Sequence, residues 1–139
     1  MDNKPDKISG KVIHAPGKRK SAVARATLRP GKGKVRLNGQ LLEHYTTQLL
    51  RLRVQEPLLL AGEAAQGLDV EVNVYGGGTS GQADAARLAI ARALVAHQPG
   101  LKQAFDDYDR LLLVADVRRK ETRKPNDSKA RAARQKSYR

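Results

Sequence analysis

"VYGGGTSGQADAARLAIARAL", which runs from Val74 to Leu94, is the stretch that decides the fold. A β-like run meets three glycines and then opens into an alanine-rich helix. Glycines at such a junction can expose the free amides of the helix N-terminus to a phosphate. They can equally let strand and helix approach closely, and the two roles are compatible. Both interpretations stay open for Gly76, Gly77 and Gly78.

A free nucleotide is a poor fit to these glycines. A Walker loop requires Gly-Lys-Ser/Thr, but Gln82 follows Gly81, and no lysine occurs between positions 34 and 102. The glycine spacing over residues 76–81 matches a dinucleotide fingerprint. However, the acidic residue expected about twenty positions later is absent, because residues 98–102 read "QPGLK". The sequence therefore predicts no nucleotide cofactor.

The helix after the glycines has a small-residue face that suits close packing on a sheet. Its pattern predicts a helix over residues 80–97, ended by Pro99 and Gly100. At 100° per residue, one face of this helix gathers Ala83, Ala86, Ile90, Ala93, Leu94 and His97.

The flanking segments predict the rest of the body. Residues 67–76 alternate apolar and polar side chains, and so do residues 19–30, whose second face carries cations. The turn "PGKGK" precedes a short strand at 35–39, so residues 19–39 predict a hairpin. A helix over 45–60 that Pro57 breaks or restarts, a short helix through Phe105 and a strand over 110–117 complete the pattern.

This order, β-β-α-β-α-β, predicts an α+β fold (an α/β sandwich) with the helices on one face. We expect residues 1–117 to form one globular body, of which 1–11 are flexible. Residues 118–139 carry ten cations, two anions and no large aliphatic side chain, so we expect a basic arm that orders on nucleic acid. A purely solubilising tail is the alternative.

The charge points to a polyanionic partner. The chain carries 27 Lys and Arg against 14 Asp and Glu, a net charge of +13. Residues 11–36 contain nine cations and no anion, whereas residues 37–117 have a net charge of −4. This distribution favours nucleic acid over a solvated basic face without a partner. The chain contains no cysteine, no apolar run of about 18 residues and no signal-peptide pattern, so we expect a cytoplasmic protein without a membrane partner.

Catalytic and metal-binding patterns are weak. The three histidines, His14, His44 and His97, are scattered, and His97 lies on the predicted core face. The aspartates at 106, 107 and 109 have no nearby histidine, so a solvated loop is favoured over a metal site. The sequence predicts no catalytic residue, no metal, no small-molecule substrate and no enzyme.

Four motifs together carry a family resemblance. They are "GKRKSAVARA" at 17–26, "GGGTSGQADAARLAIARAL" at 76–94, "DVRRKETRKP" at 116–125 and "KARAARQKSYR" at the end. In this order they resemble ribosomal protein nine of the small subunit, over about residues 12–139. The "QKSYR" ending and "RLRVQEPLLLAGE" resemble its archaeal and eukaryotic branch.

The resemblance implies an α/β sandwich with a left-handed β-α-β crossover, like the second domain of ribosomal protein five. It also implies a structural place in the head of the small subunit, on ribosomal RNA and beside neighbouring head proteins. The C-terminal arm would then reach peptidyl-site tRNA. The family commonly has glycine where Asn126 stands here, and asparagine tolerates positive φ, so we expect the turn to survive.

The expected contacts follow from charge, glycine position and this resemblance. Those to ribosomal RNA are Lys18, Arg19, Lys20, Arg25, Arg29, Lys32, Lys34, Arg36, Gly76, Gly77, Gly78, Gln82, Arg87, Arg118, Arg119, Lys120, Arg123, Lys124, Lys129, Arg131 and Arg134. Those to tRNA are Lys136, Ser137, Tyr138 and Arg139.

Two rival functions stay open. The same fold superfamily holds kinase-like enzymes that bind ATP through glycine-rich loops, although the missing lysine and catalytic carboxylate argue against one here. A nonspecific nucleic-acid packaging protein would need only a basic surface, and the ordered motifs disfavour it. Co-sedimentation with small subunits at high salt separates all three.

Overall fold

The computed structural model describes residues 10–135, which contain five strands and four helices. Two 3-10 turns accompany them, at Leu42–His44 and Arg110–Leu112. The strands are β1 (Ile13–Arg19), β2 (Ala22–Pro30), β3 (Val35–Leu37), β4 (Gln40–Leu41) and β5 (Leu68–Tyr75). The helices are α1 (Gln48–Ala61), α2 (Glu63–Gln66), α3 (Thr79–His97) and α4 (Leu101–Tyr108).

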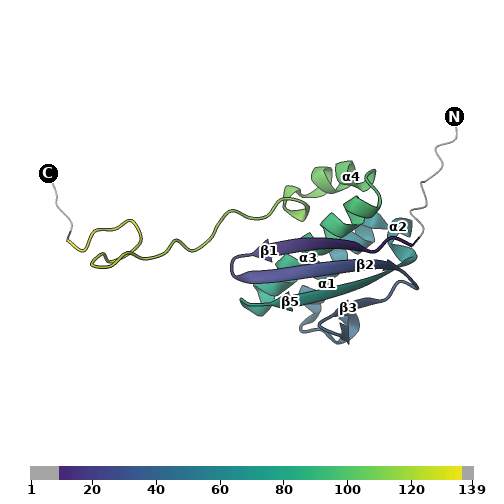
Figure 1. Cartoon of the computed structure of the whole chain (residues 1–139), viewed down its shortest axis with the longest axis horizontal. Helices are drawn as coiled ribbons and strands as arrows, with labels where there is room; N and C mark the ends of the chain where they lie inside the picture. The colour runs from purple at the N-terminus through teal and green to yellow at the C-terminus, as the bar shows by residue number, and fades with distance from the viewer. Residues whose placement is uncertain (1–9, 136–139) are drawn as a thin grey trace.

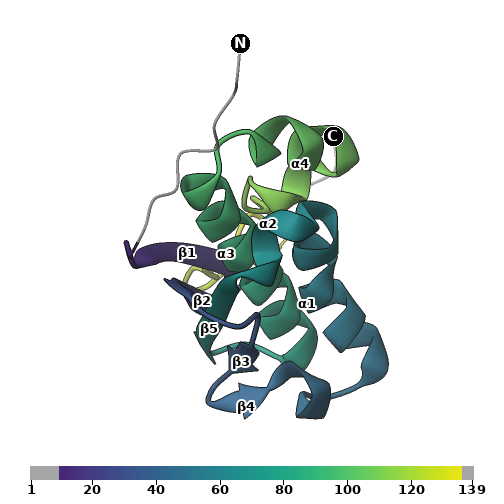
Figure 2. The same ribbon diagram turned by 90° about the vertical axis from the view of Figure 1, so that its right-hand side faces the viewer.

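The strands form one mixed sheet in the order β1-β2-β5-β3-β4. Only β3 and β5 are parallel, and α1 lies in the connection between them. The helices cover one face of the sheet, and the other face is open (Figure 2). The predicted α+β class is confirmed.

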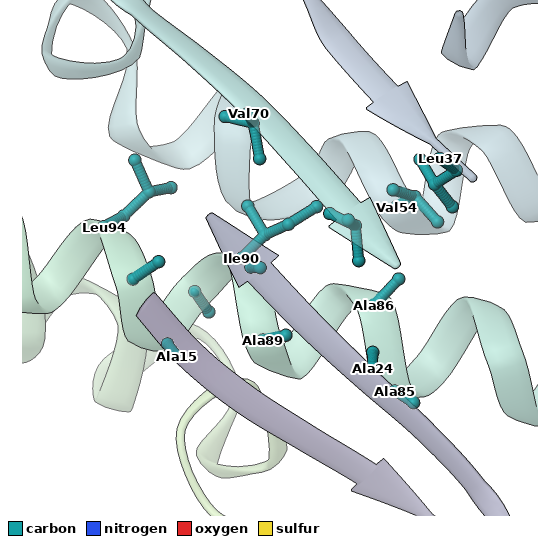
Figure 3. Packing of buried hydrophobic residues seen from close by; sticks show 14 of the residues in the cluster. Ala15, Ala24, Leu37, Val54, Val70, Ala85, Ala86, Ala89, Ile90 and Leu94 are labelled. Carbon is teal, nitrogen blue, oxygen red and sulfur yellow. The ribbon is translucent and has the colours of Figure 1, made fainter. Parts of the chain in front are cut away.

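Helix α3 forms the centre of the core, because it packs on β1, β2 and β5 and α1 packs on it in turn. Nine of its side chains are buried, six of them alanines. Figure 3 shows the α3 residues Ala85, Ala86, Ala89, Ile90 and Leu94 on the helix that packs against the strands carrying Ala15, Ala24 and Val70. The predicted small-residue face is confirmed, and burial extends around the helix beyond it. His97, predicted on the core face, is half-buried.

Strand β1 and helix α3 approach each other closely, and Gly17 permits it. A Cβ built on Gly17 would lie 2.1 Å from the carbonyl oxygen of Ala85 and 2.7 Å from the amide nitrogen of Ala89. No side chain fits that space. Gly17 therefore sets how near the edge strand lies to the helix.

The β5–α3 junction uses two of its three glycines for conformation. Gly76 and Gly77 have φ of 74° and 65°, where side chains are disfavoured. A Cβ on Gly76 would also lie 2.6 Å from the carbonyl oxygen of Ser21. Gly78 has an extended backbone, with φ −94°, and open space around its Cα. The packing role is thus specific to the first two glycines.

The hairpin partner was predicted wrongly. Strand β2 does not pair with the strand at 35–37; it pairs with β1 and β5, and β3 pairs with β5. Strand β1 went unpredicted because Pro16 and Gly17 argue against a strand interior. Proline is nevertheless tolerated in an edge strand, which is where β1 lies.

The strand predicted over residues 110–117 is absent. Asp109 accepts the N–H of Leu111 at 2.9 Å and starts the turn Arg110–Leu112. Leu112 is then buried, and Arg92 donates to the carbonyl oxygen of Leu113 at 3.0 Å. The apolar run therefore closes the helical side of the core, with its polar backbone bonded to side chains and to the turn.

The prediction that Pro57 interrupts the 45–60 helix is also wrong. Helix α1 runs unbroken from Gln48 to Ala61, with Pro57 inside it and fully buried. Proline removes one backbone hydrogen bond from a helix interior. Burial of its ring in the core offsets that loss.

Residues beyond Val117 lead away from the body without a helix or strand up to residue 135 (Figure 1). Their side chains are exposed, apart from Ala130 and Ala132, which are half-buried. Asn126 has φ 67° and lies in a turn in which the N–H of Asp127 donates to the carbonyl oxygen of Lys124. The expectation that Asn126 keeps the turn is confirmed.

We predict that Gly17→Ala destabilises the body by about 2 kcal/mol or more, because its Cβ overlaps the α3 backbone and β1 must move away. Urea denaturation of the purified chain measures this. Gly67→Ala is the matched control, since φ is −94° and no atom lies within 4 Å of the added Cβ. It should change stability by less than about 1 kcal/mol. Equal effects of both variants would contradict the close-approach argument.

We predict that Gly77→Val destabilises the junction strongly, whereas Gly78→Val is nearly neutral. At Gly77 a β-branched side chain would meet positive φ and lie 3.0 Å from Ala22, whereas Gly78 already has a backbone that valine favours. Thermal unfolding of the two variants measures the difference. A stable, fully folded Gly77→Val chain would contradict the prediction.

Candidate nucleic-acid interface

Two basic segments about 100 residues apart in sequence meet at one end of the body. The turn between β1 and β2 consists of Lys20 and Ser21, and Lys20 has φ 53°, which is unusual for a residue with a side chain. An open cleft lies between this turn and the start of the C-terminal segment. Its lining is formed by Lys20, Ser21, Arg118, Arg119 and Lys120. We call these five residues the basic cleft.

Asp116 fixes the C-terminal side of the basic cleft. Its carboxylate accepts hydrogen bonds from the Arg118 guanidinium at 2.7 and 3.0 Å, and from the Arg118 backbone N–H at 2.9 Å. It also pairs with Arg19 of β1. The hydrogen bonds from Arg118 hold the pKa of Asp116 far below its usual range. The Asp116 side chain is only 10% exposed, so the first arm residues are tied to the edge of the sheet.

The ion pairs continue from Arg19 into the helices. Asp84 of α3 lies 3.7 Å from Arg19 and 3.1 Å from Arg53 of α1. Arg53 also donates to the Ser80 hydroxyl at 3.3 Å. The network therefore joins β1, α1, α3 and the base of the arm. It neutralises charges that would otherwise repel one another at the end of the molecule.

Two of the predicted RNA contacts are largely buried within such networks. Arg19 is 18% exposed and paired with Asp84 and Asp116. Arg87 is 13% exposed and lies 2.5 Å from Glu56 and 3.0 Å from Asp109. Burial works against ionisation of Asp109, but the N–H of Leu111 and the Arg87 guanidinium outweigh it, and its pKa is lowered. Both arginines are thus engaged in holding the body together.

The glycine loop lies beside the β1–β2 turn, because Gly76 approaches Ser21 closely. Gln82 donates to the carbonyl oxygen of Gly76 at 3.1 Å, so this predicted contact residue closes the loop. Gly76, Gly77 and Gly78 are exposed. The β5–α3 junction, the β1–β2 turn and the basic cleft therefore lie at the same end of the molecule. The sequence alone did not predict this arrangement.

The open face of the sheet carries the other predicted body cations. Arg25, Arg29 and Arg36 are exposed on alternate positions of β2 and β3. The loop 31–34 wraps around Asp69, which accepts the backbone N–H of Lys32 at 2.8 Å and of Lys34 at 2.9 Å. These bonds lower the pKa of Asp69. The side chains of Lys32 and Lys34 are then presented at the edge of this face.

The predicted stem residues of the arm are exposed, with Arg131 paired to Glu121 at 2.9 Å. The others are Arg119, Lys120, Arg123, Lys124, Lys129 and Arg134. The predicted tRNA contacts, Lys136, Ser137, Tyr138 and Arg139, lie outside the described residues.

Sequence reasoning missed three members of this end of the molecule. Asp116 and Asp84 were not predicted as members, although "DVRR" places Asp116 two residues before an arginine. Tyr75, on the open face of β5, is 52% exposed. Its place in an alternating strand directly before the glycines was the available signal.

Within residues 10–135, no three acidic or histidine side chains are grouped as metal ligands would be. No described helix combines the length and apolarity needed to cross a bilayer. Each acidic side chain near the basic cleft forms an ion pair with an arginine. What this end offers is backbone amides, hydroxyls and cations, which together suit phosphate groups.

Comparison with known proteins agrees with this chemistry. The family model described as "Ribosomal protein S9/S16" matches residues 17–139. Relatives called small ribosomal subunit protein uS9 include one from Pyrobaculum aerophilum, 48% identical over 93% of this chain and 92% of its own length. Those from Methanothrix thermoacetophila and Methanococcus maripaludis are each 47% identical, over 93% of this chain and 99% of their own lengths. The match spans the body and the arm, and the chain belongs to the ribosomal protein S9/S16 family.

Proposed function

We propose that this chain is a structural constituent of the small ribosomal subunit that binds ribosomal RNA in the subunit head. The observation that carries the proposal is the basic cleft, where the β1–β2 turn and the arm base bring Lys20, Arg118, Arg119 and Lys120 together. The names of its relatives state the same assembly for them. The family is a structural one, so the chain is not an enzyme, as the sequence predicted.

Phosphate contacts of this kind position a protein on RNA without reading its sequence. Ion pairing explains which cations are available for them. Arg19 and Arg87 are paired within the body, whereas Lys18 and Lys20 are exposed, and so are Arg119 and Lys120. We therefore assign the RNA backbone to the exposed set and give Arg19 and Arg87 a positioning role.

The arm extends this interface away from the body. We propose that its stem, from Arg118 to Arg134, tracks ribosomal RNA, and that Lys136 to Arg139 contact peptidyl-site tRNA. An extended segment of residues 118–139 reaches on the order of 70 Å, enough to leave the body for a functional centre. Cations spaced along an exposed chain, with an aromatic side chain near its end, suit phosphate and base contacts.

We also infer that the chain works beside neighbouring head proteins of the cytoplasmic ribosome. The β3–α1–β5 connection is inferred to have the left-handed sense that the resemblance implies. Its parallel pairing, Val35 with Val70, supports a crossover at this place. Right-handed crossovers are the strong default, so this sense would be a mark of the fold.

We predict that the double variant Lys20→Ala/Lys120→Ala weakens binding to a transcript of the head domain of small-subunit ribosomal RNA. Each lost phosphate contact should flatten the dependence of log K on log salt by roughly 0.7, the scale for single strands. Filter binding over a range of salt measures both quantities. Lys102→Ala/Arg110→Ala removes the same charge from the helical side and is the control. An equal loss in both double variants would show only a general charge effect.

We predict that deleting Ser137, Tyr138 and Arg139 leaves incorporation into small subunits nearly intact but speeds tRNA dissociation from the peptidyl site. Loss of a charge-assisted contact is worth about 1–3 kcal/mol. Dissociation of labelled tRNA from purified mutant subunits measures the effect. Arg123→Ala/Lys124→Ala, in the arm stem, should instead reduce incorporation. Normal incorporation with unchanged tRNA dissociation would contradict the tRNA role of the tip.

A further inference from the structure

The half of the open sheet face nearest the β1–β2 turn combines an aromatic ring, an amide and cations. The strand register aligns these residues in two rows across β1, β2 and β5. One row is Lys18, Val23 and Tyr75, and the next is Pro16, Arg25 and Asn73. All six side chains alternate with residues that face α3. We call them the platform.

Tyr75 is the unusual member of the platform. The preceding residue, Val74, is 7% exposed, whereas Tyr75 is 52% exposed on the opposite side of β5. The Arg25 guanidinium carbon lies 5.8 Å from the centre of the ring, and an Arg25 nitrogen lies 3.5 Å from the Tyr75 hydroxyl. The arginine thus steadies the ring from one side, and about half of the tyrosine surface stays open to solvent.

The charge on this face changes along the strands. The six platform positions include two cations and no carboxylate. Further from the turn, the same face carries Glu71 and Asp69 beside Arg29 and Arg36, and Asp69 is engaged by the loop 31–34. A polyanion that lies on the platform therefore meets no carboxylate among its six positions.

The platform also adjoins the phosphate-binding end of the molecule. Tyr75 is the last residue of β5 and directly precedes Gly76, which lies against Ser21 of the β1–β2 turn. An RNA strand with a phosphate at Lys20 can therefore place an adjoining nucleotide over the platform. Exposed aromatic rings on a sheet commonly bind single-stranded RNA, because an unpaired base can stack on the ring. A guanidinium plane can take part in the same stack.

We propose that Tyr75 and Arg25 form a stacking site for one unpaired base of RNA, with Asn73 beside it as a hydrogen-bonding group for the base edge. The proposal rests on the proposed binding of ribosomal RNA, and it specifies an unpaired base as the part of that RNA that binds to the open sheet face. A paired base is excluded from the site, because its faces are covered by its neighbours in the helix. The alternative role for Tyr75 is cross-strand packing on Val23 alone.

The dependence on salt separates stacking from phosphate contacts. Phosphate binding releases counterions, so its free energy falls as salt rises, whereas stacking on a ring is sequence-tolerant and does not require charge. Removing the ring should therefore lower affinity by a similar factor at every salt concentration. Removing Lys20 and Lys120 should instead change the slope of log K against log salt.

The test compares two RNA hairpins with the full-length chain, one with an unpaired purine-rich loop that contains 2-aminopurine and one that is almost fully paired. Wild-type protein should prefer the unpaired loop and quench 2-aminopurine. Tyr75→Leu should reduce affinity for the loop by about 5- to 140-fold with an unchanged salt slope. Tyr75→Phe keeps a ring and should retain both the preference and most of the quenching.

Tyr108→Leu is the matched control, because Tyr108 is 55% exposed but lies on α4, on the helical side of the molecule. It should leave both RNA affinities unchanged, and thermal unfolding checks that all variants fold. A Tyr75→Leu chain that keeps the preference and the quenching overturns the stacking site. So does a parallel loss of affinity for both hairpins. Wild-type protein that binds neither hairpin would instead refute the RNA-binding function itself.

Discussion

The contact between β1 and α3 is the constraint on which the rest of the structure depends. Because Gly17 has no side chain, the edge strand can lie directly on the backbone of Ala85 and Ala89. The alanines of α3 supply the same closeness along β2 and β5. Because these surfaces have little side-chain volume, the sheet and the helix are fixed at a short distance. A methyl group at this contact has no space into which to relax.

The close contact also decides which charges can meet. It brings Arg19, at the end of β1, within reach of Asp84 on α3 and of Asp116 beyond the second 3-10 turn. Arginine pairs with carboxylates through a planar, rigid group and is suited to such partly buried sites. The ion pairs therefore join the first strand to the segment after the second 3-10 turn, and the C-terminal segment begins at a fixed place beside the β1–β2 turn.

The cations behind the net charge of +13 thus fall into two groups, those paired within the body and those exposed on its surface. Some arginines, such as Arg19 and Arg87, are largely buried and neutralised by acids. The cations of the β1–β2 turn, the open sheet face and the described part of the arm are exposed instead. A surface of this kind repels itself and gains most from a partner that carries many phosphates. The family assignment and the charge distribution support the same class of partner.

The sequence by itself determined the α+β class, the long α3 helix, the alternating strands β2 and β5 and the basic composition of residues 118–139. Each of these follows from local periodicity or composition over ten or more residues. The left-handed turn at Asn126 was also predictable, because asparagine is among the few residues that adopt it. The four motifs carried the family, and the matched relatives confirm it.

Only the tertiary structure decided the strand partners, the path of residues 110–117 and which residues gather in the candidate interface. Strand β1 forms because β2 pairs with it and α3 packs on it, although Pro16 and Gly17 disfavour a strand locally. Leu112 closes the core from a turn, because Asp109 and Arg92 bind the backbone around it. Whether a cation is exposed or paired with a carboxylate depends on residues distant in sequence, so charge alone could not distinguish Arg19 from Lys20.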